Sequence, residues 1–283
     1  MKKGLIMEGG AMRGMFTAGV IDVFMENKIT FDGAIGVSAG AAFGCNLKSG
    51  QIGRAIRYNV DYCKDKRYCS MWSLLTTGDM YGADFCYHQL PEKLDVFDTK
   101  AYNENPMEFY VVCTDVLTGN PVYKNLSTTE DGYLEWIRAS ASMPLVSRVV
   151  KIGDYEMLDG GISDSIPLKY FESAGYDKNV VILTQPKSYV KQTNGMMPAM
   201  KLFMRRYPMM IKAMEKRHIV YNETVKYICE KEKKGEVFVI RPEDTLPLKR
   251  VEHNEDKLKE TYKIGRKTAE KQLKSLVSFL EGE

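Results

Sequence analysis

The sequence has few of the features that mark several large protein classes. Its six cysteines include no Cys-x-x-Cys pair and lack the density of a disulfide framework, so we expect free, mostly buried thiols. The net charge of +3 is too small to indicate a nucleic-acid-binding protein. The apolar run 5–7 is too short for a signal peptide, and no later run is long enough to span a bilayer. These absences predict a cytoplasmic protein.

A glycine-rich loop near the N-terminus lacks the residues that nucleotide binding requires. Residues 9–14 have the Gly-x-x-x-x-Gly spacing of a P-loop, but Met15 and Phe16 stand where Lys and Ser or Thr are needed. The dinucleotide fingerprint Gly-x-Gly-x-x-Gly also fails, because Gly9 and Gly10 are adjacent. Backbone amides lined by glycine can instead form an oxyanion hole, where they point at a developing negative charge. In that use, Arg13 would hold the loop or assist the anion.

A single serine stands between a predicted strand and a predicted helix. Residues 33–37 form a short apolar segment, and Ala39 begins a run of small residues. Gly36, Ser38 and Gly40 fit the Gly-x-Ser-x-Gly pattern of a nucleophile elbow, whose sharp turn needs neighbours without bulk. The helix would direct its free N–H groups at charge forming beside Ser38. By itself, the pentapeptide fits an ordinary turn with a solvated serine equally well.

An aspartate followed by two glycines comes at the end of a predicted β-hairpin. The hairpin covers residues 149–158 and has a Gly-Asp turn in its middle. Gly160 and Gly161 leave Asp159 open to close approach by a ligand or another loop. On spacing alone, however, Asp-Gly-Gly is better explained as turn chemistry.

The expected fold class is α/β. We expect three α/β/α layers around a mostly parallel central sheet, with residues 1–190 as the main domain. Residues 191–283 would form a mainly helical extension, whose strand 236–241 returns to the central sheet. The last helix follows Asn254, a typical N-cap, and repeats apolar residues every three or four positions.

Taken together, the three motifs resemble those of the patatin-like phospholipase family. Gly-Gly-Ala-Met-Arg-Gly (9–14), Gly-Val-Ser-Ala-Gly (36–40) and Asp-Gly-Gly (159–161) occur in the order seen in that family. The stretches 114–119 and 138–144 also look like it. The resemblance covers roughly residues 4–190 and implies a bacterial patatin-like serine acyl hydrolase, with its catalytic domain in residues 1–190.

The resemblance implies a serine–aspartate dyad that works without histidine. It gives the nucleophile to Ser38 and the base to Asp159, and the dyad would cleave acyl chains from phospholipids or lysophospholipids without a metal or other cofactor. Because a carboxylate is a weak base for a serine hydroxyl, we expect burial to raise the pKa of Asp159. The oxyanion hole would be formed by the loop residues Gly9, Gly10, Ala11 and Arg13 and, from elbow chemistry, by the N–H of Ala39.

Two other interpretations stay open. A Ser-Asp-His esterase would need a histidine after Asp159, which leaves His218 or His253. Neither lies in a glycine-framed loop, so solvated histidines are the favoured interpretation. The other alternative is a non-catalytic lipid-binding or regulatory protein of the same fold, against which the intact Ser38 and Asp159 speak.

Two further segments bear on the substrate, which we expect to be a lipid or a small ester rather than nucleic acid. The aromatic residues of 71–87 either line an apolar channel or stack in the core, and core stacking is favoured. Residues 196–214 hold seven of the 17 methionines among lysines and arginines. This mixture suits either a lipid-facing lid in peripheral contact with a membrane or two helices packed on the core, because Pro198 and Pro208 break any single long helix.

Overall fold

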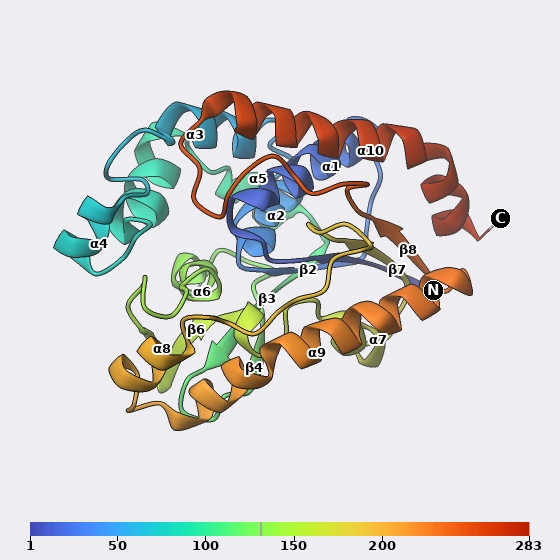
Figure 1. Ribbon diagram of the computed structural model, residues 1–283. Coiled ribbons are helices and arrows are strands. Elements are labelled where there is room, and N and C mark those ends of the chain that lie inside the picture. The colour runs from blue at the N-terminus through green and yellow to red at the C-terminus, as the bar shows by residue number, and fades with distance from the viewer. Residues whose placement is uncertain (131, 283) are drawn as a thin grey trace.

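The computed structural model describes residues 1–130 and 132–282, which are built around one central sheet (Figure 1). In these residues the sheet has eight strands: β1 (Lys2–Met7), β2 (Gly33–Val37), β3 (Glu108–Asp115), β4 (Pro121–Asn125), β5 (Val150–Ile152), β6 (Tyr155–Asp159), β7 (Tyr176–Ile182) and β8 (Val237–Ile240). Their order is β5-β6-β3-β2-β1-β7-β8, with β4 also paired to β3. From β3 to β8 along this order every pair is parallel, whereas β4, β5 and β6 pair antiparallel.

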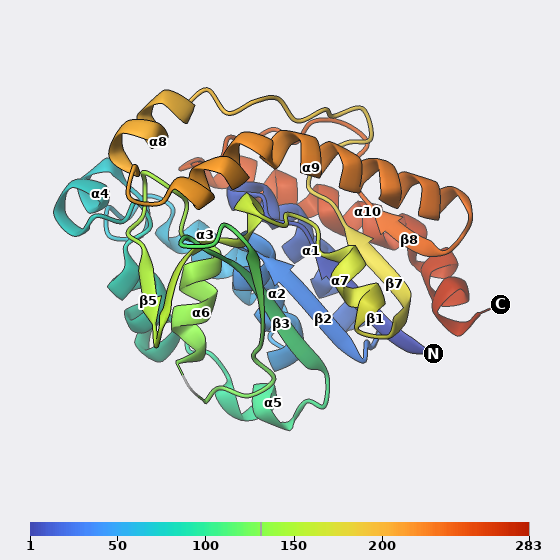
Figure 2. The ribbon, with the colours of Figure 1, turned by 90° about the horizontal axis from the view of Figure 1, so that it is seen from below.

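Helices cover both faces of this sheet (Figures 1 and 2). One face carries α1 (Gly14–Glu26), α2 (Ala39–Ser49), α3 (Arg54–Tyr62) and α10 (Glu255–Glu281), and the other carries α7 (Leu168–Ser173) and α9 (Pro208–Lys233). Two short helices, α4 (Met71–Thr77) and α8 (Met197–Phe203), lie at the same end of the molecule in both views. The remaining elements are α5 (Thr99–Glu104), α6 (Tyr133–Ser140), the π-helix η2 (Phe85–Leu94) and the 3₁₀ turns η1 (Ala11–Arg13) and η3 (Gly160–Ile162).

Alternation along β1 explains why helices lie on both faces. Successive side chains of a strand point to opposite faces. Leu5 and Met7 belong to the core that includes Phe16 of α1, whereas Ile6 belongs to a second core with Phe171 of α7. All are completely buried, as expected for a parallel strand with helices on each side. The predicted three-layer α/β/α fold is thereby confirmed.

Helices α1 and α10 approach each other backbone to backbone. A Cβ atom added at Gly19 would lie 2.2 Å from the carbonyl oxygen of Tyr262, and one added at Gly265 would lie 2.1 Å from that of Phe16. Only glycine allows such a contact at both positions. The close crossing joins the helix that follows the 9–14 loop to a helix more than 200 residues later in the chain.

We expect Gly265→Ala to lower stability, although alanine has the higher helix propensity. The propensity gain is about 1 kcal/mol, but the added methyl group must displace the Phe16 backbone, and overpacking typically costs about 1–3 kcal/mol. Thermal unfolding would show a lower Tm for Gly265→Ala than for Lys267→Ala, a change at an exposed position of the same helix. A Tm equal to or above that of the unchanged protein would contradict the contact.

The C-terminal region contributes one strand and several core side chains. In the stretch 236–241, β8 pairs in parallel with β7. The methionine-rich segment 196–214 forms α8 and the beginning of α9, and four of its methionines pack in one apolar cluster with Leu158 and Ile162: Met200, Met204, Met210 and Met214. Leu202 and Phe203 are 65% and 75% exposed. The segment therefore combines core packing with exposed apolar residues. Among the described residues, no helix has the length and apolar character needed to cross a membrane.

Candidate active site

Ser38 occupies the sharp turn between β2 and α2. Its φ of +55° and ψ of −121° form a backbone conformation that non-glycine residues rarely adopt. The Ser38 N–H donates a hydrogen bond to Ser140 Oγ at 2.9 Å, and that hydroxyl donates to the Val112 carbonyl at 2.6 Å. Helix α6 and strand β3 thus hold the strained turn in place. Sequence reasoning missed this role of Ser140, because no local pattern marks a serine at a helix end as the partner of a distant turn.

Gly36 and Gly40 allow the turn because side chains at these positions would meet backbone atoms. A Cβ atom at Gly36 would lie 2.5 Å from the Ala41 nitrogen, and one at Gly40 would lie 2.3 Å from the Met7 carbonyl oxygen. Helix α2 begins at Ala39, directly after the serine, so the positive end of its dipole faces the Ser38 side chain. This is the backbone arrangement of a nucleophile elbow.

Asp159 ends β6 and is fixed by its neighbours at three atoms. Its N–H donates to the Ser142 carbonyl at 2.8 Å, and its carbonyl accepts from Thr114 Oγ1 at 2.9 Å. Its Oδ1 accepts the N–H of Gly161 at 2.7 Å. Gly160 allows the close pairing with β3, since a Cβ there would lie 2.1 Å from the carbonyl oxygen of Val112. The fold brings this carboxylate and Ser38 to the wall of one cavity, close enough for the Ser38 side chain to lower the pKa of Asp159.

The surroundings of Asp159 raise the pKa of its carboxyl group, as expected from the sequence. Burial raises the pKa of the carboxyl group, because its charged form loses contact with water. The positive charge of Arg217 on α9 opposes this effect most strongly, followed by the hydrogen bonds from Ser38 and from the Gly161 N–H. The net pKa remains above the ordinary aspartate value. Such a carboxylate accepts a proton more readily than a solvated one.

The 9–14 loop runs directly beside the serine. A Cβ atom at Gly9 would lie 3.0 Å from Ser38 Cβ, and Ala11 has a φ of +49°. The Met12 N–H donates to the Arg250 carbonyl at 3.3 Å, which ties the loop to the segment before α10. In the described part of the chain, the buried Nε of Arg13 has no hydrogen-bond partner.

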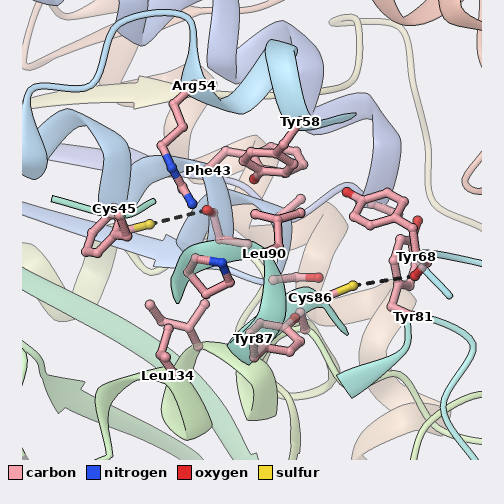
Figure 3. A pocket seen from close by; sticks show the side chains of 18 of the residues that line it. Phe43, Cys45, Arg54, Tyr58, Tyr68, Tyr81, Cys86, Tyr87, Leu90 and Leu134 are labelled. Atoms are coloured by element: carbon pink, nitrogen blue, oxygen red, sulfur yellow. Dashed lines mark hydrogen bonds between the residues drawn. The ribbon is translucent and has the colours of Figure 1, made fainter. Parts of the chain in front are cut away.

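Ser38 is one of the residues that line an apolar cavity, part of whose wall is shown in Figure 3. Aromatic and aliphatic side chains from α2, α3, η2 and α6 gather around it, including Phe43, Tyr58, Tyr87, Leu90 and Leu134. Its one charged lining residue among those described, Arg54, is paired with Asp95 at 3.3 Å and donates to Asn46 Oδ1 at 3.0 Å. The preference for core stacking of residues 71–87 was wrong in part: Tyr81, Cys86 and Tyr87 line this cavity, although Tyr81 also packs against Tyr68.

Ser38 also lines a second, charged cavity. Ala11, Ser38 and Met143 line both cavities. The ionisable side chains lining the second cavity are Glu8, Arg13, Asp159, Lys191, Arg217 and Arg250. Sequence reasoning identified only Arg13 and Asp159 among them. Lys191, Arg217 and Arg250 come from the C-terminal third of the chain, where no motif marks them.

Histidine is absent from this centre. Within residues 1–130 and 132–282, no histidine lines either cavity at Ser38. His88 lies near Glu92 and Glu135, and His253 Nδ1 contacts the carbonyl of Cys63. His218 is a partly buried residue of α9. The esterase with a histidine triad therefore finds no support in the geometry.

Comparisons with known proteins find a family for the N-terminal part. A family model described as patatin-like phospholipase matches residues 5–172, and a domain of unknown function matches residues 207–281. The uncharacterized protein YjjU of Escherichia coli (strain K12) is 29% identical over 272 residues, which is 93% of this chain and 74% of that protein. An uncharacterized NTE family protein of Mycobacterium tuberculosis is 27% identical over 206 residues, or 69% of this chain and 32% of that protein.

The fold is also similar to that of a solved structure. The crystal structure of VipD from Legionella pneumophila superposes with a TM-score of 0.50 and covers 97% of this chain and 67% of VipD. The sequence identity is only 14%, so the similarity concerns the fold alone.

Proposed function

This chain belongs to the patatin-like phospholipase family, and we propose that it is a serine acyl hydrolase that cleaves carboxylic esters of lipids. One observation carries the proposal: Ser38, Asp159 and the 9–14 loop meet at a single point, where an apolar cavity and a charged cavity join. The substrates we expect are the acyl chains of phospholipids or lysophospholipids.

In the first half of the reaction, the Ser38 hydroxyl attacks the ester carbonyl while Asp159 takes its proton. The carbonyl oxygen becomes an oxyanion, which the backbone N–H groups of residues 9–11 and of Ala39 stabilise as hydrogen-bond donors. The carbon–oxygen bond to the alcohol then breaks, and Asp159 returns the proton to that alcohol. The acyl group remains on Ser38 as an ester.

The second half repeats these steps with water. Asp159 accepts a proton from a water molecule, which attacks the acyl-enzyme carbonyl. The same N–H groups stabilise the second oxyanion, and the fatty acid leaves as Ser38 Oγ regains its proton from Asp159. The raised pKa of Asp159 supports this role, because a stronger base removes a hydroxyl proton more easily.

The apolar cavity suits the acyl chain. Its lining is almost entirely aromatic and aliphatic, and it begins at Ser38 and Ala39. Burial of a methylene group is worth about 0.8 kcal/mol, so a chain held there gains affinity with each carbon that it buries. Because its lining is apolar, we assign the acyl side of the ester to this cavity and the alcohol side to the charged cavity.

We also propose that residues 1–190 act as the catalytic part and that the helical extension brings it into peripheral contact with a membrane, from the cytoplasm. Leu202 and Phe203 of α8 are largely exposed, with Lys201 and Arg205 beside them in the sequence. At the same end of the molecule, α4 exposes further large apolar residues, among them Trp72 and Leu75 at 53% and 82% (Figures 1 and 2). Apolar residues with neighbouring cations favour the interface of an anionic bilayer.

Replacement of Phe203 by Ser is expected to weaken membrane binding by about 10-fold or more, because an inserted aromatic ring contributes about 1.5–3 kcal/mol. Sedimentation with vesicles that contain an anionic phospholipid measures the bound fraction. Ile52→Ser serves as the control, because it changes a half-exposed apolar residue in the loop before α3, away from α8. Equal binding by the two variants would remove α8 from the proposed contact.

The experiment that tests the proposed function is labelling of the folded protein with a fluorophosphonate, followed by intact-mass analysis. One adduct, together with release of fatty acid from a panel of lipid esters, is the expected result. Without adduct and without fatty-acid release, the chain is better explained as a lipid-binding protein of the same fold.

A further inference from the structure

The charged cavity at Ser38 contains more positive than negative side chains. Four cations line it, Arg13, Lys191, Arg217 and Arg250, against two carboxylates, Glu8 and Asp159. If all six are ionised, the lining carries two positive charges in excess. This excess lies in a cavity that the proposed catalytic serine also lines, the one to which we assign the alcohol side of the ester.

The two carboxylates are already engaged by other groups. Glu8 is buried and accepts hydrogen bonds from the Thr184 N–H at 2.6 Å and from the Tyr221 hydroxyl at 2.7 Å. Asp159 accepts the Gly161 N–H at 2.7 Å, and the Ser38 side chain helps to lower its pKa. Across residues 1–130 and 132–282, none of the four cations has a carboxylate oxygen within 4.0 Å. The cavity therefore holds positive charge without direct ion pairs.

Lys191 and Arg217 are held in place by specific contacts. The Asn222 side chain accepts from the Lys191 N–H at 2.9 Å and donates to its carbonyl at 3.0 Å. The Lys191 ammonium lies 4.0 Å from the centre of the Tyr221 ring. Arg217 donates through Nε to the carbonyl of Gly161, two residues after Asp159. These cations are thus parts of a built site rather than solvated surface charges.

The pKa of Lys191 is lowered by burial first and by the neighbouring positive charges second. Burial lowers the pKa of its ammonium to about 7, and the positive charges of Arg217, Arg13 and Arg250 add to this effect, with Glu8 opposing it. A bound anion would give all of these cations a counter-charge and would thereby raise the pKa of Lys191.

We propose that Lys191, Arg217 and Arg250 bind the phosphate of the substrate head group, so that the enzyme prefers lipid esters with a net negative head over neutral and zwitterionic ones. This inference rests on the proposed hydrolase function. Arginine and lysine donate charge-assisted hydrogen bonds to phosphate oxygens. A choline or ethanolamine group on the same head would bring a further positive charge toward these cations, which disfavours it.

Three substrates that carry the same single acyl chain separate the effect of the phosphate group on kcat/KM from that of the choline group. They are 1-oleoylglycerol 3-phosphate, 1-oleoylglycerol and 1-oleoylglycero-3-phosphocholine, presented in the same neutral detergent micelles. We expect kcat/KM for the phosphate monoester to exceed that for the other two by about 10-fold or more, mainly through a lower KM. Equal kcat/KM values for the three esters would overturn the inference while leaving the hydrolase function intact.

Variants at Lys191 and Arg217 test whether these residues cause the preference for the phosphate ester. Lys191→Met and Arg217→Met should each reduce the ratio of kcat/KM for the phosphate ester to that for 1-oleoylglycerol by about 10-fold or more. Use of a ratio cancels any effect that Arg217 has on Asp159. Lys187→Met and Lys216→Met, at exposed positions near each site residue, should keep the original ratio. Lys191→Arg should restore most of the preference, since the charge rather than the packing is required. A ratio unchanged in both cavity variants would contradict the assignment.

Binding of small anions provides a readout that needs no turnover. Calorimetric titration with glycerol 3-phosphate should show binding that is lost in Lys191→Met, and it should do so even if no ester is hydrolysed. Inorganic phosphate should bind more weakly, because it lacks the glycerol part. If inorganic phosphate binds as tightly as glycerol 3-phosphate and the esters show no order of preference, the cavity serves free phosphate and the lipid-head assignment is wrong.

Discussion

Ser38→Ala is expected to abolish the fluorophosphonate adduct and to lower kcat/KM for lipid esters by at least about 10³-fold. Without the hydroxyl, no acyl-enzyme forms, and only the oxyanion-hole donors and substrate binding remain. Because alanine has no oxygen to attack the phosphorus atom of the probe, the mass spectrum of this variant should show the unmodified chain alone. Fatty-acid release from micellar substrate, measured by titration or by mass spectrometry, gives the rate.

The substitution should leave the fold in place, so loss of activity can be separated from loss of structure. The Ser38 N–H still reaches Ser140 Oγ, since that bond uses the backbone. The matched control is Ser275→Ala, which removes an exposed hydroxyl from α10 and should label as fully as the unchanged chain. A Ser38→Ala protein that still acquires a stoichiometric adduct would place the nucleophile elsewhere.

Asp159→Asn is expected to reduce both the rate of labelling and kcat/KM by about 10²–10⁴-fold, the usual contribution of a general base. An amide keeps the size of the carboxyl group but cannot take the Ser38 proton. Asp154→Asn, the same change at an exposed position in the β5–β6 turn, should behave as the unchanged protein does. Comparable activity of the two variants would exclude Asp159 as the base.

Asp159→Asn should keep or raise the stability of the protein, although it lowers the activity. A carboxyl group whose pKa is raised by folding binds more protons in the native state than in the unfolded state, so its ionisation lowers stability as the pH rises through the folded pKa. Asparagine cannot ionise and avoids this loss. Near neutral pH, we therefore expect a Tm equal to or above that of the unchanged protein, together with the large loss of activity.

The same pKa fixes the acid limb of the pH–rate profile. Asp159 must be deprotonated to act as the base, and its pKa lies above the ordinary value of 3.8, so kcat/KM should fall at a pH above 3.8 as the solution is acidified. Arg217 lowers the pKa of Asp159, and Arg217→Met should therefore move the limb to higher pH. Lys216→Met should leave it in place. A limb at or below 3.8 would contradict the burial effect.

The sequence predicted those parts of the site whose backbone is determined locally. The turn at Ser38 requires glycine on both sides, and a strand directly before it is apolar because both faces of the sheet are covered. β2 accordingly begins and ends at the predicted residues, Gly33 and Val37. Asn254 likewise caps α10 through hydrogen bonds to the N–H groups of Asp256 and Lys257, as its residue type suggested. Each of these features depends on neighbours within a few positions.

The charged cavity could not be predicted in the same way. Lys191 lies in an irregular segment and Arg217 in the middle of a long helix, where basic residues are most often solvated. Their positions beside Ser38 follow from the path of the chain after β7, which no local pattern specifies. Glu8 directly follows β1, but its partners Thr184 and Tyr221 are far away in the sequence. Long-range topology, rather than residue type, creates this half of the site.

The glycine-to-glycine crossing of α1 and α10 has a consequence for biosynthesis. α10 buries Leu276 and Leu280 in the same core as Val20 and Val23 of α1. A growing chain emerges from the ribosome with α1 first, so these valines lack their partners until residue 280 has been made. Domains that fold as they are synthesised usually complete their N-terminal part early. Here the helix that leads out of the 9–14 loop must wait for a late segment, and we expect the surroundings of Ser38 to stay unordered in the nascent chain until translation has passed α10.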